Sequence, residues 1–175
     1  MDDALEHLNS LPGGEASAEL LKCCGSTRWA SAMMEERPFR DTDALEEAAD
    51  RIWWSLGRED WLEAFRSHPK IGERKAARET GEEARRWAED EQQGTSGAGR
   101  DVLAALAEAN RAYEERFGHI FIVCAKGKSA AEMLTLLRAR IGNDPETELR
   151  VAVEEQRRIT QLRLKKSLES GAGRR

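Results

Sequence analysis

The chain contains one strand-like segment, the β-branched and aromatic run Ile120–Val123. This segment cannot form a sheet alone, because its backbone N–H and C=O groups need partners on a neighbouring strand. Elsewhere apolar residues recur at the three- and four-residue spacing of a helix face, most clearly at Leu103, Leu106, Tyr113 and Phe117. A length of 175 residues with 39% hydrophobic content suits one compact core. We therefore predict an all-α fold, a single compact domain over residues 1–175 with about eight helices and one short extended segment near residues 120–124.

Glycine, proline and capping residues mark where the predicted helices begin and end. Ser26 or Thr27, the run Asp41–Asp43 and Ser129 are candidate N-caps, because their side-chain oxygens accept a hydrogen bond from the first turn. The predicted helices are a weak first one at Asp2–Leu8, then Glu15–Cys24, a stretch through Trp29 and Met33, Ala44–Leu56, Arg58–Arg66, Glu79–Gln93, a stretch from Arg100 to Gly118, another from Ser129 to Ile141, and a last one from Glu146 to about Leu168.

Net charge and hydropathy exclude some partners. The formal net charge of -5 argues against nucleic acid, and the basic residues from Arg157 to Lys166 follow Glu154 and Glu155, as on a solvated helix face. The longest apolar run, Ile120–Ala125, is far shorter than the roughly 20 residues of a membrane span. The first twelve residues lack the basic and apolar regions of a signal peptide. We expect a cytoplasmic protein without a nucleic-acid or membrane partner.

The cysteines and histidines give no metal or disulfide signature. Cys23, Cys24 and Cys124 lack a CxxC spacing, which fits reduced thiols. His7, His68 and His119 are too scattered for a known metal motif. The glycine-rich stretch Gly94–Gly99 lacks the lysine and spacing of a phosphate-binding loop, so we interpret it as a linker. We predict no metal.

The segment Ser67–Arg74, SHPKIGER, holds the first candidate for acid–base chemistry. Proline disfavours the α region for the residue before it, so His68 should stand at a helix end with its ring free to point elsewhere. Histidine titrates near neutrality, which suits proton transfer. A histidine before a proline is more often an ordinary loop residue, so this pattern leaves both interpretations open.

Three other features leave similar alternatives. Asn110 is a polar residue on an apolar stripe, which is more often satisfied by a neighbour than by a ligand. The segment Ile120–Val123 is either a buried connector or a stretch whose free backbone groups face a small ligand. Gln156 and Arg163 fall on the inward stripe of the last helix. Arg163 is paired with a buried carboxylate, directed at an anionic ligand, or a snorkelling arginine at a helix end.

Several ordered motifs resemble the decarboxylases of 2-oxo-4-hydroxy-4-carboxy-5-ureidoimidazoline (OHCU) in uric acid breakdown. They are CCGSTRWASAMMEERPF, HPKIG, WAEDEQ, FGHIFIVCAKG and ELRVAVEEQRRITQLRL, and the resemblance extends over nearly the whole chain. The resemblance implies an all-α, cofactor-free and commonly homodimeric enzyme that makes (S)-allantoin. It implies catalytic roles for His68 and Glu91, and substrate-binding roles for Pro69, Ala88, Gln92, Ile122, Val123, Cys124 and Arg163.

Two positions depart from the family pattern. Ala88 stands where serine is common, which removes a hydroxyl contact to the substrate, and FGHI replaces the common FGFP, so that His119 and Ile120 are expected to reshape the entrance to the extended segment. The chemistry itself needs few groups, because a ring C=N beside the carboxylate can accept the electrons released with CO2. His68 could then move the hydroxyl proton, Glu91 could orient His68 or bind substrate N–H groups, and Arg163 could pair with a substrate oxygen.

The rival hypothesis is a non-catalytic helical interaction module that keeps the fold. In that case the apolar stripes are core, His68 is a loop residue and the charges are surface. The two hypotheses differ in geometry, since an enzyme needs its acid–base and binding groups to converge.

Overall fold

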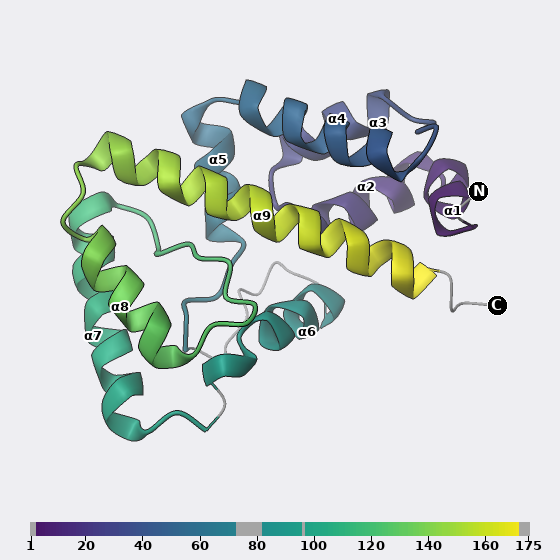
Figure 1. The fold of residues 1–175 in the computed structure, drawn as a ribbon. Coiled ribbons are helices and arrows are strands. Elements are labelled where there is room, and N and C mark those ends of the chain that lie inside the picture. Colours follow the sequence, from purple (N-terminus) through teal and green to yellow (C-terminus); the bar gives the residue numbers. More distant parts are fainter. Residues whose placement is uncertain (1–2, 73–81, 96, 172–175) are drawn as a thin grey trace. The chain divides into compact units, whose positions relative to one another are not determined.

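The computed structural model describes residues 3–72, 82–95 and 97–171. These residues form nine α-helices and one short 3-10 helix, with no strand among them, which confirms the all-α prediction (Figure 1). The elements are α1 Asp3–Ser10, α2 Gly13–Cys23, α3 Thr27–Glu35, α4 Thr42–Ser55, α5 Arg58–Arg66, α6 Glu82–Glu91, the 3-10 helix η1 Gln93–Thr95, α7 Arg100–Phe117, α8 Ala130–Arg140 and α9 Pro145–Gly171.

The predicted helix starts follow from capping. The side chains of Ser26, Asp41 and Ser129 accept hydrogen bonds from the backbone N–H groups of Trp29, Ala44 and Glu132, at 3.2, 2.8 and 3.1 Å. Each bond satisfies one of the N–H groups that a helix leaves free in its first turn. The predicted helix Glu79–Gln93 corresponds to α6, and its first residues, 79–81, lie outside the described residues.

Contacts divide the chain into two compact units. Unit 1 comprises Met1–Ala64 and Arg157–Arg175, and unit 2 comprises Phe65–Gln156. The expectation of a single domain over residues 1–175 stays a prediction.

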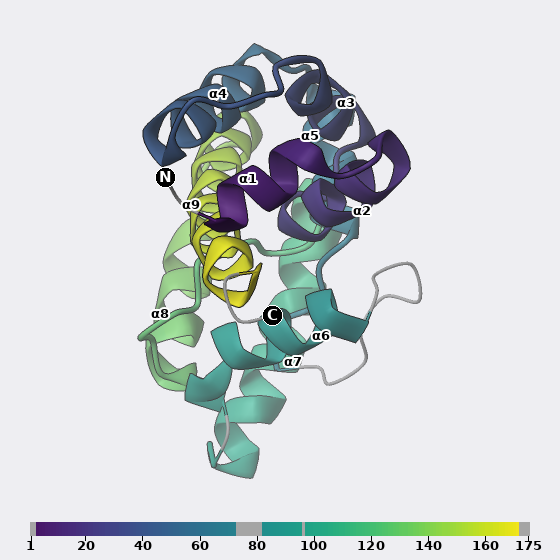
Figure 2. The same cartoon turned by 90° about the vertical axis from the view of Figure 1, so that its right-hand side faces the viewer.

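Unit 1 is built on two buried tryptophans. α3 contacts both α2 and α4 (Figure 2), and Trp29 and Trp53 are almost completely buried. The indole N–H of Trp29 donates to the carbonyl of Ala49 at 3.1 Å, so its one polar atom is satisfied. The C-terminal part of α9 is attached to α4 by an ion pair between Arg157 and Asp50, at 3.0 Å. This attachment fixes the part of α9 that carries Arg163.

Unit 2 is built on the packing of α7 against α8, which lie side by side in both views (Figures 1 and 2). Its core consists of Ile71, Leu106, Tyr113, Phe117, Phe121, Val123, Ala125, Ala130, Met133, Leu134 and Leu137. The stretch predicted to be extended forms neither helix nor strand and connects α7 to α8. The side chains of Phe121, Ile122 and Val123 are buried there, and we call this stretch the connector. That its backbone groups face a small ligand stays a prediction.

Candidate active site

The predicted site residues fall into the two units. Unit 2 contains His68, Pro69, Ala88, Glu91, Gln92, Ile122, Val123 and Cys124. Unit 1 contains Arg163.

His68 lies directly after α5, as the proline that follows it predicts. Its backbone N–H donates to the carbonyl of Phe65 at 3.1 Å, which closes the last turn of the helix. Its ring is half-buried, and Nε2 lies 2.6 Å from Oε1 of Gln156 on α9. Gln156 is completely buried. Gln156 falls on the inward stripe of the last helix, but that pattern alone does not mark it as a site residue.

Helix α7 holds the loop after His68 at two points. Lys70 forms an ion pair with Glu114 at 2.7 Å, and the side-chain N–H of Asn110 donates to the carbonyl of Ile71 at 3.1 Å. Asn110 is buried, and its Oδ1 has no hydrogen-bond partner among the described residues. Asn110 is thus satisfied in part by the backbone, and it holds the loop that carries His68.

The C-terminal end of α6 holds the same loop from another side. The backbone N–H of Gly72 donates to Oε1 of Gln92 at 3.1 Å. Gly72 has φ +86°, a conformation that glycine adopts without strain. Gln92 therefore connects the loop to Glu91, the last residue of α6. The remaining residues of the SHPKIGER segment, Glu73 and Arg74, lie outside the described residues.

Ala88 lies one turn before Gln92 on α6 and is 5% exposed, next to the buried Trp87. A methyl group here offers no hydrogen bond. The carbonyl of Ala88 accepts a hydrogen bond from the backbone N–H of Gln92 at 3.1 Å, and this bond closes the last turn of α6.

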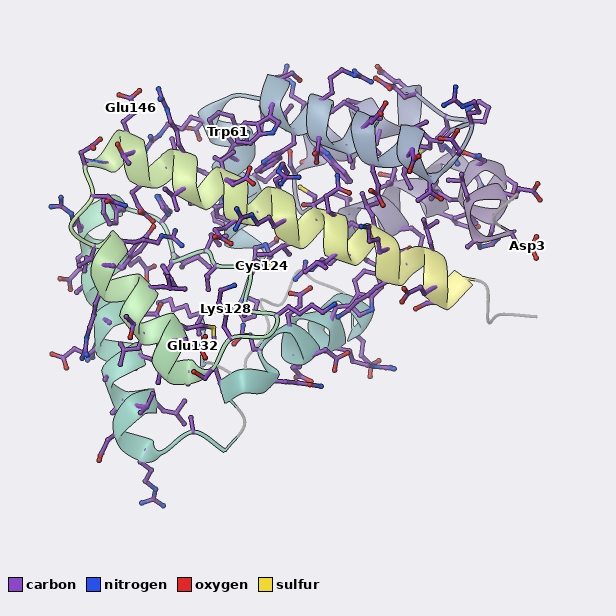
Figure 3. The ribbon with its side chains drawn as sticks, viewed as in Figure 1. Asp3, Trp61, Cys124, Lys128, Glu132 and Glu146 are labelled. Carbon is purple, nitrogen blue, oxygen red and sulfur yellow. The ribbon has the colours of Figure 1, made fainter. Side chains whose placement is uncertain are left out.

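Charged side chains surround the connector at Ile122 and Cys124. The carbonyl of Ile122 accepts a hydrogen bond from Arg140 at 2.7 Å. The N–H of Cys124 donates to Glu155 at 2.9 Å, and its carbonyl accepts from Lys128 at 2.8 Å. Figure 3 shows Cys124 and Lys128 on the stretch that leads into α8. Among the described residues, no hydrogen bond reaches the backbone N–H or C=O of Val123.

The thiol of Cys124 is poorly suited to be a nucleophile. Burial raises its pKa, and the carboxylates of Glu155 and Glu91 raise it further. A thiol with a raised pKa is protonated at neutral pH and reacts slowly. The influence of Glu91 on Cys124 also means that the end of α6 lies within electrostatic range of the connector.

The glycine-rich stretch Gly94–Gly99 is not simply a linker, because it begins inside η1. A Cβ atom added to Gly94 would lie 1.8 Å from the carbonyl oxygen of Lys128. Only glycine permits this approach. Gly94 therefore brings the end of α6 against the loop that follows the connector, which corrects the linker interpretation for this position.

Arg163 is buried in unit 1, with 4% of its surface exposed. A snorkelling arginine keeps its charged head in water, so that alternative is wrong. Its guanidinium donates to the carbonyl of Lys22 at 3.3 Å. The same guanidinium lies close enough to Cys23 and Cys24 to act on their pKa values. The planar fork of this side chain is thus fixed beside the end of α2.

His119, one of the two departures from the family pattern, packs as an aromatic core residue. Its ring centroid lies 5.3 Å from that of Phe65 and 5.6 Å from that of Tyr113, and it stacks on Phe117 at 6.1 Å. It is 8% exposed. These contacts assign His119 a packing role between α5 and α7. Whether His119 and Ile120 reshape an entrance stays a prediction.

The part of the chain that the structure describes contains no group of three His, Cys, Asp or Glu side chains placed to hold a metal ion. No helix within it is both long and apolar enough to cross a membrane.

The fold and the site define an all-α protein with a candidate acid–base centre built around one histidine. Comparison with known proteins identifies its family: the model for OHCU decarboxylase matches residues 9–165. The chain belongs to the OHCU decarboxylase family.

Individual relatives agree with this assignment. The chain is 39% identical over 145 residues to the uric acid degradation bifunctional protein TTL of Arabidopsis thaliana, a match that covers 82% of this chain but only 44% of that protein. It is 32% identical over 143 residues to a 2-oxo-4-hydroxy-4-carboxy-5-ureidoimidazoline decarboxylase of Amia calva, covering 82% of this chain and 81% of the relative. A crystal structure of OHCU decarboxylase in the presence of (S)-allantoin superposes with a TM-score of 0.75 at 36% identity, covering 87% of this chain and 98% of that one.

Proposed function

We propose that this chain is a carboxy-lyase that converts OHCU to (S)-allantoin in uric acid degradation, without a cofactor. The observation that carries the proposal is the fixed position of His68 in a chain of this family. Its ring is held by Gln156 at 2.6 Å, and the loop that follows it is held by α6 and α7. These contacts hold the ring in one orientation, which acid–base catalysis requires of its acting group.

The substrate supplies its own electron sink. Its carboxylate is attached to a carbon beside a ring C=N, which accepts the electron pair when CO2 leaves. The protein must then orient the carboxylate and control two proton transfers. We assign to His68 removal of the hydroxyl proton and return of a proton to one face of the carbanion. Protonation from one face gives one enantiomer.

The remaining groups bind and orient the substrate. The backbone N–H and C=O of Val123 suit the C=O and N–H groups of a ureido chain, and Ile122 and Cys124 flank them. Glu91 can accept N–H bonds of the substrate or hold the His68 ring, and the amide N–H of Gln92 can donate to a substrate oxygen. Pro69, which directly follows His68, and Ala88, which lies one helical turn before Gln92, complete this set.

The proposal is tested by adding the purified chain to freshly generated OHCU and recording CO2 release and the optical activity of the product. We expect (S)-allantoin in excess, because uncatalysed protonation from both faces yields a racemate. EDTA should leave the rate unchanged, because the described residues contain no group of three His, Cys, Asp or Glu side chains placed to hold a metal ion. A racemic product at the uncatalysed rate would favour the non-catalytic interaction module. Reversible loss of activity with EDTA would contradict the metal-free chemistry.

Arg163 is proposed to pair with a substrate oxygen through two parallel N–H bonds. Arg163→Lys keeps the charge but loses this fork, so we expect a loss of about 1.5 to 3 kcal/mol in binding, or about one to two decades in kcat/KM. The measurement is steady-state kinetics, with Arg158→Lys as the control because Arg158 is exposed on the same helix. Loss of folding with substrate affinity unchanged would make Arg163 a structural residue instead.

We further propose a cytoplasmic homodimer that binds no nucleic acid. The thiols support a reducing compartment: all three are free, and burial raises the pKa of Cys23 to about 12 and that of Cys24 to about 11. Such thiols are inert and act as small packing groups. The homodimer rests on the family resemblance, and the net charge of -5 disfavours nucleic acid.

A further inference from the structure

The side chain of Gln156 is a buried polar group in contact with the ring of His68. It has no exposed surface, and its Oε1 lies 2.6 Å from Nε2 of His68. An amide oxygen accepts hydrogen bonds and cannot donate them. With the amide in this orientation, Nε2 of the neutral ring carries the hydrogen and Nδ1 carries the lone pair.

We propose that Gln156 is a positioning residue that fixes the tautomer and the orientation of His68, so that Nδ1 is the nitrogen that exchanges a proton with the substrate. This inference rests on the proposed function of His68. The choice of an amide has a physical reason. A carboxylate at the same distance would stabilise the imidazolium, whereas a neutral oxygen orients the ring and leaves it able to act as a base.

Glu155, the residue before Gln156 on α9, holds another part of the proposed site. Glu155 accepts the N–H of Cys124 at 2.9 Å. Successive residues on a helix point about 100° apart, so one turn of α9 holds the His68 ring with one side chain and the connector with the next. The spacing between His68 and Val123 is thus set by a rigid helix. Catalytic groups need such support, because a displacement of about 1 Å can cost about a hundredfold in rate.

The first test needs no variant. Nitrogen NMR of the wild-type chain, at a pH where the ring is neutral, distinguishes the two tautomers of His68 by the shifts of its ring nitrogens. The resonance is assigned with His68→Asn. We expect hydrogen on Nε2. Hydrogen on Nδ1 would show that Gln156 donates from its nitrogen, and would overturn the assignment of Nδ1 as the reactive atom.

The second test is Gln156→Met, which keeps the length and the burial of the side chain but removes the acceptor. We expect kcat to fall about 10- to 100-fold, with KM within about threefold of wild type, and the His68 spectrum to show a mixture of tautomers. Leu149→Met is the control, because Leu149 is also buried on α9 in unit 2. It should change neither kcat nor the tautomer.

The outcomes separate this inference from the proposed function. An active His68→Asn variant would contradict the proposed function itself. An inactive His68→Asn variant, together with wild-type kcat and a single tautomer in Gln156→Met, would overturn only the role of Gln156. In the His68→Asn background, Gln156→Met should cause no further loss, because its effect passes through the ring. A further loss would indicate that Gln156 acts on the substrate or on the fold.

Discussion

We expect His68→Asn to lower kcat/KM for OHCU decarboxylation by about 10²- to 10⁴-fold, the range that a general acid–base group contributes. The asparagine side chain is polar and of similar reach, so the half-buried position stays filled. It cannot take up and return a proton near neutral pH. The measurement is steady-state CO2 release, accompanied by far-UV circular dichroism and a melting curve, both of which should stay near wild type.

The control is His7→Asn, because His7 is exposed on α1 and is remote in sequence from the assigned residues. It should leave both the rate and the melting temperature unchanged. A His68→Asn variant that keeps most of its turnover would remove the acid–base role and, with it, the proposed mechanism. A variant with normal rate but loss of enantiomeric excess would instead assign His68 to the final protonation alone.

Helix boundaries could be predicted because their causes are local. The caps at Ser26, Asp41 and Ser129 act within three residues of themselves. The helix over Arg58–Arg66 has the predicted bounds, since Gly57 precedes it and His68-Pro69 follows it. Such start and stop signals depend only on the residues within about one helical turn.

Contacts between residues that lie far apart in the sequence could not be predicted in the same way. Gln156 and His68 are 88 positions apart, and Arg140 reaches a carbonyl 18 positions earlier. The inward stripe of the last helix indicated that Gln156 is buried, but a polar residue on such a stripe can be satisfied by many neighbours. Only the packing of α9 shows which neighbour it meets.

The role of Gly94 could not be predicted from composition. A run of glycine and serine is flexible in isolation, so composition alone indicates a linker at this position. The structure shows a close approach to the carbonyl of Lys128, which depends on a residue 34 positions away. A glycine that is required for space has the same letter as one that is required for flexibility.

Arg140→Met is the second variant for which we expect a large effect, here on stability. The guanidinium of Arg140 lies in contact with Glu148, at 2.8 Å from Nε and 2.5 Å from a terminal nitrogen. Glu148 has no exposed surface, and it also accepts hydrogen bonds from the hydroxyl of Tyr113 and the amide of Asn143. Burial and the bond to Glu148 raise the pKa of Tyr113, so its hydroxyl stays a donor.

Removal of one partner leaves a buried charge without its counter-ion, which costs about 3 to 5 kcal/mol. Methionine fills a similar volume, so the loss reports the charge more than the packing. We expect the free energy of unfolding in urea to fall by that amount. Arg138→Met is the matched control, since Arg138 is exposed on the same helix, and its effect should stay within about 0.5 kcal/mol.

Arg140→Met should also weaken substrate binding. The third donor of Arg140 holds the carbonyl of Ile122 at 2.7 Å, so its loss frees the connector next to Val123. Arg140→Met that is still folded at low temperature should therefore bind substrate more weakly, with a raised KM. The double variant Arg140→Met, Glu148→Gln removes both charges and should recover part of the stability, because no buried carboxylate is left unpaired. It should not recover KM, because the Ile122 carbonyl still lacks its donor. Recovery of both together would assign Arg140 to stability alone and would exclude a role in holding the connector.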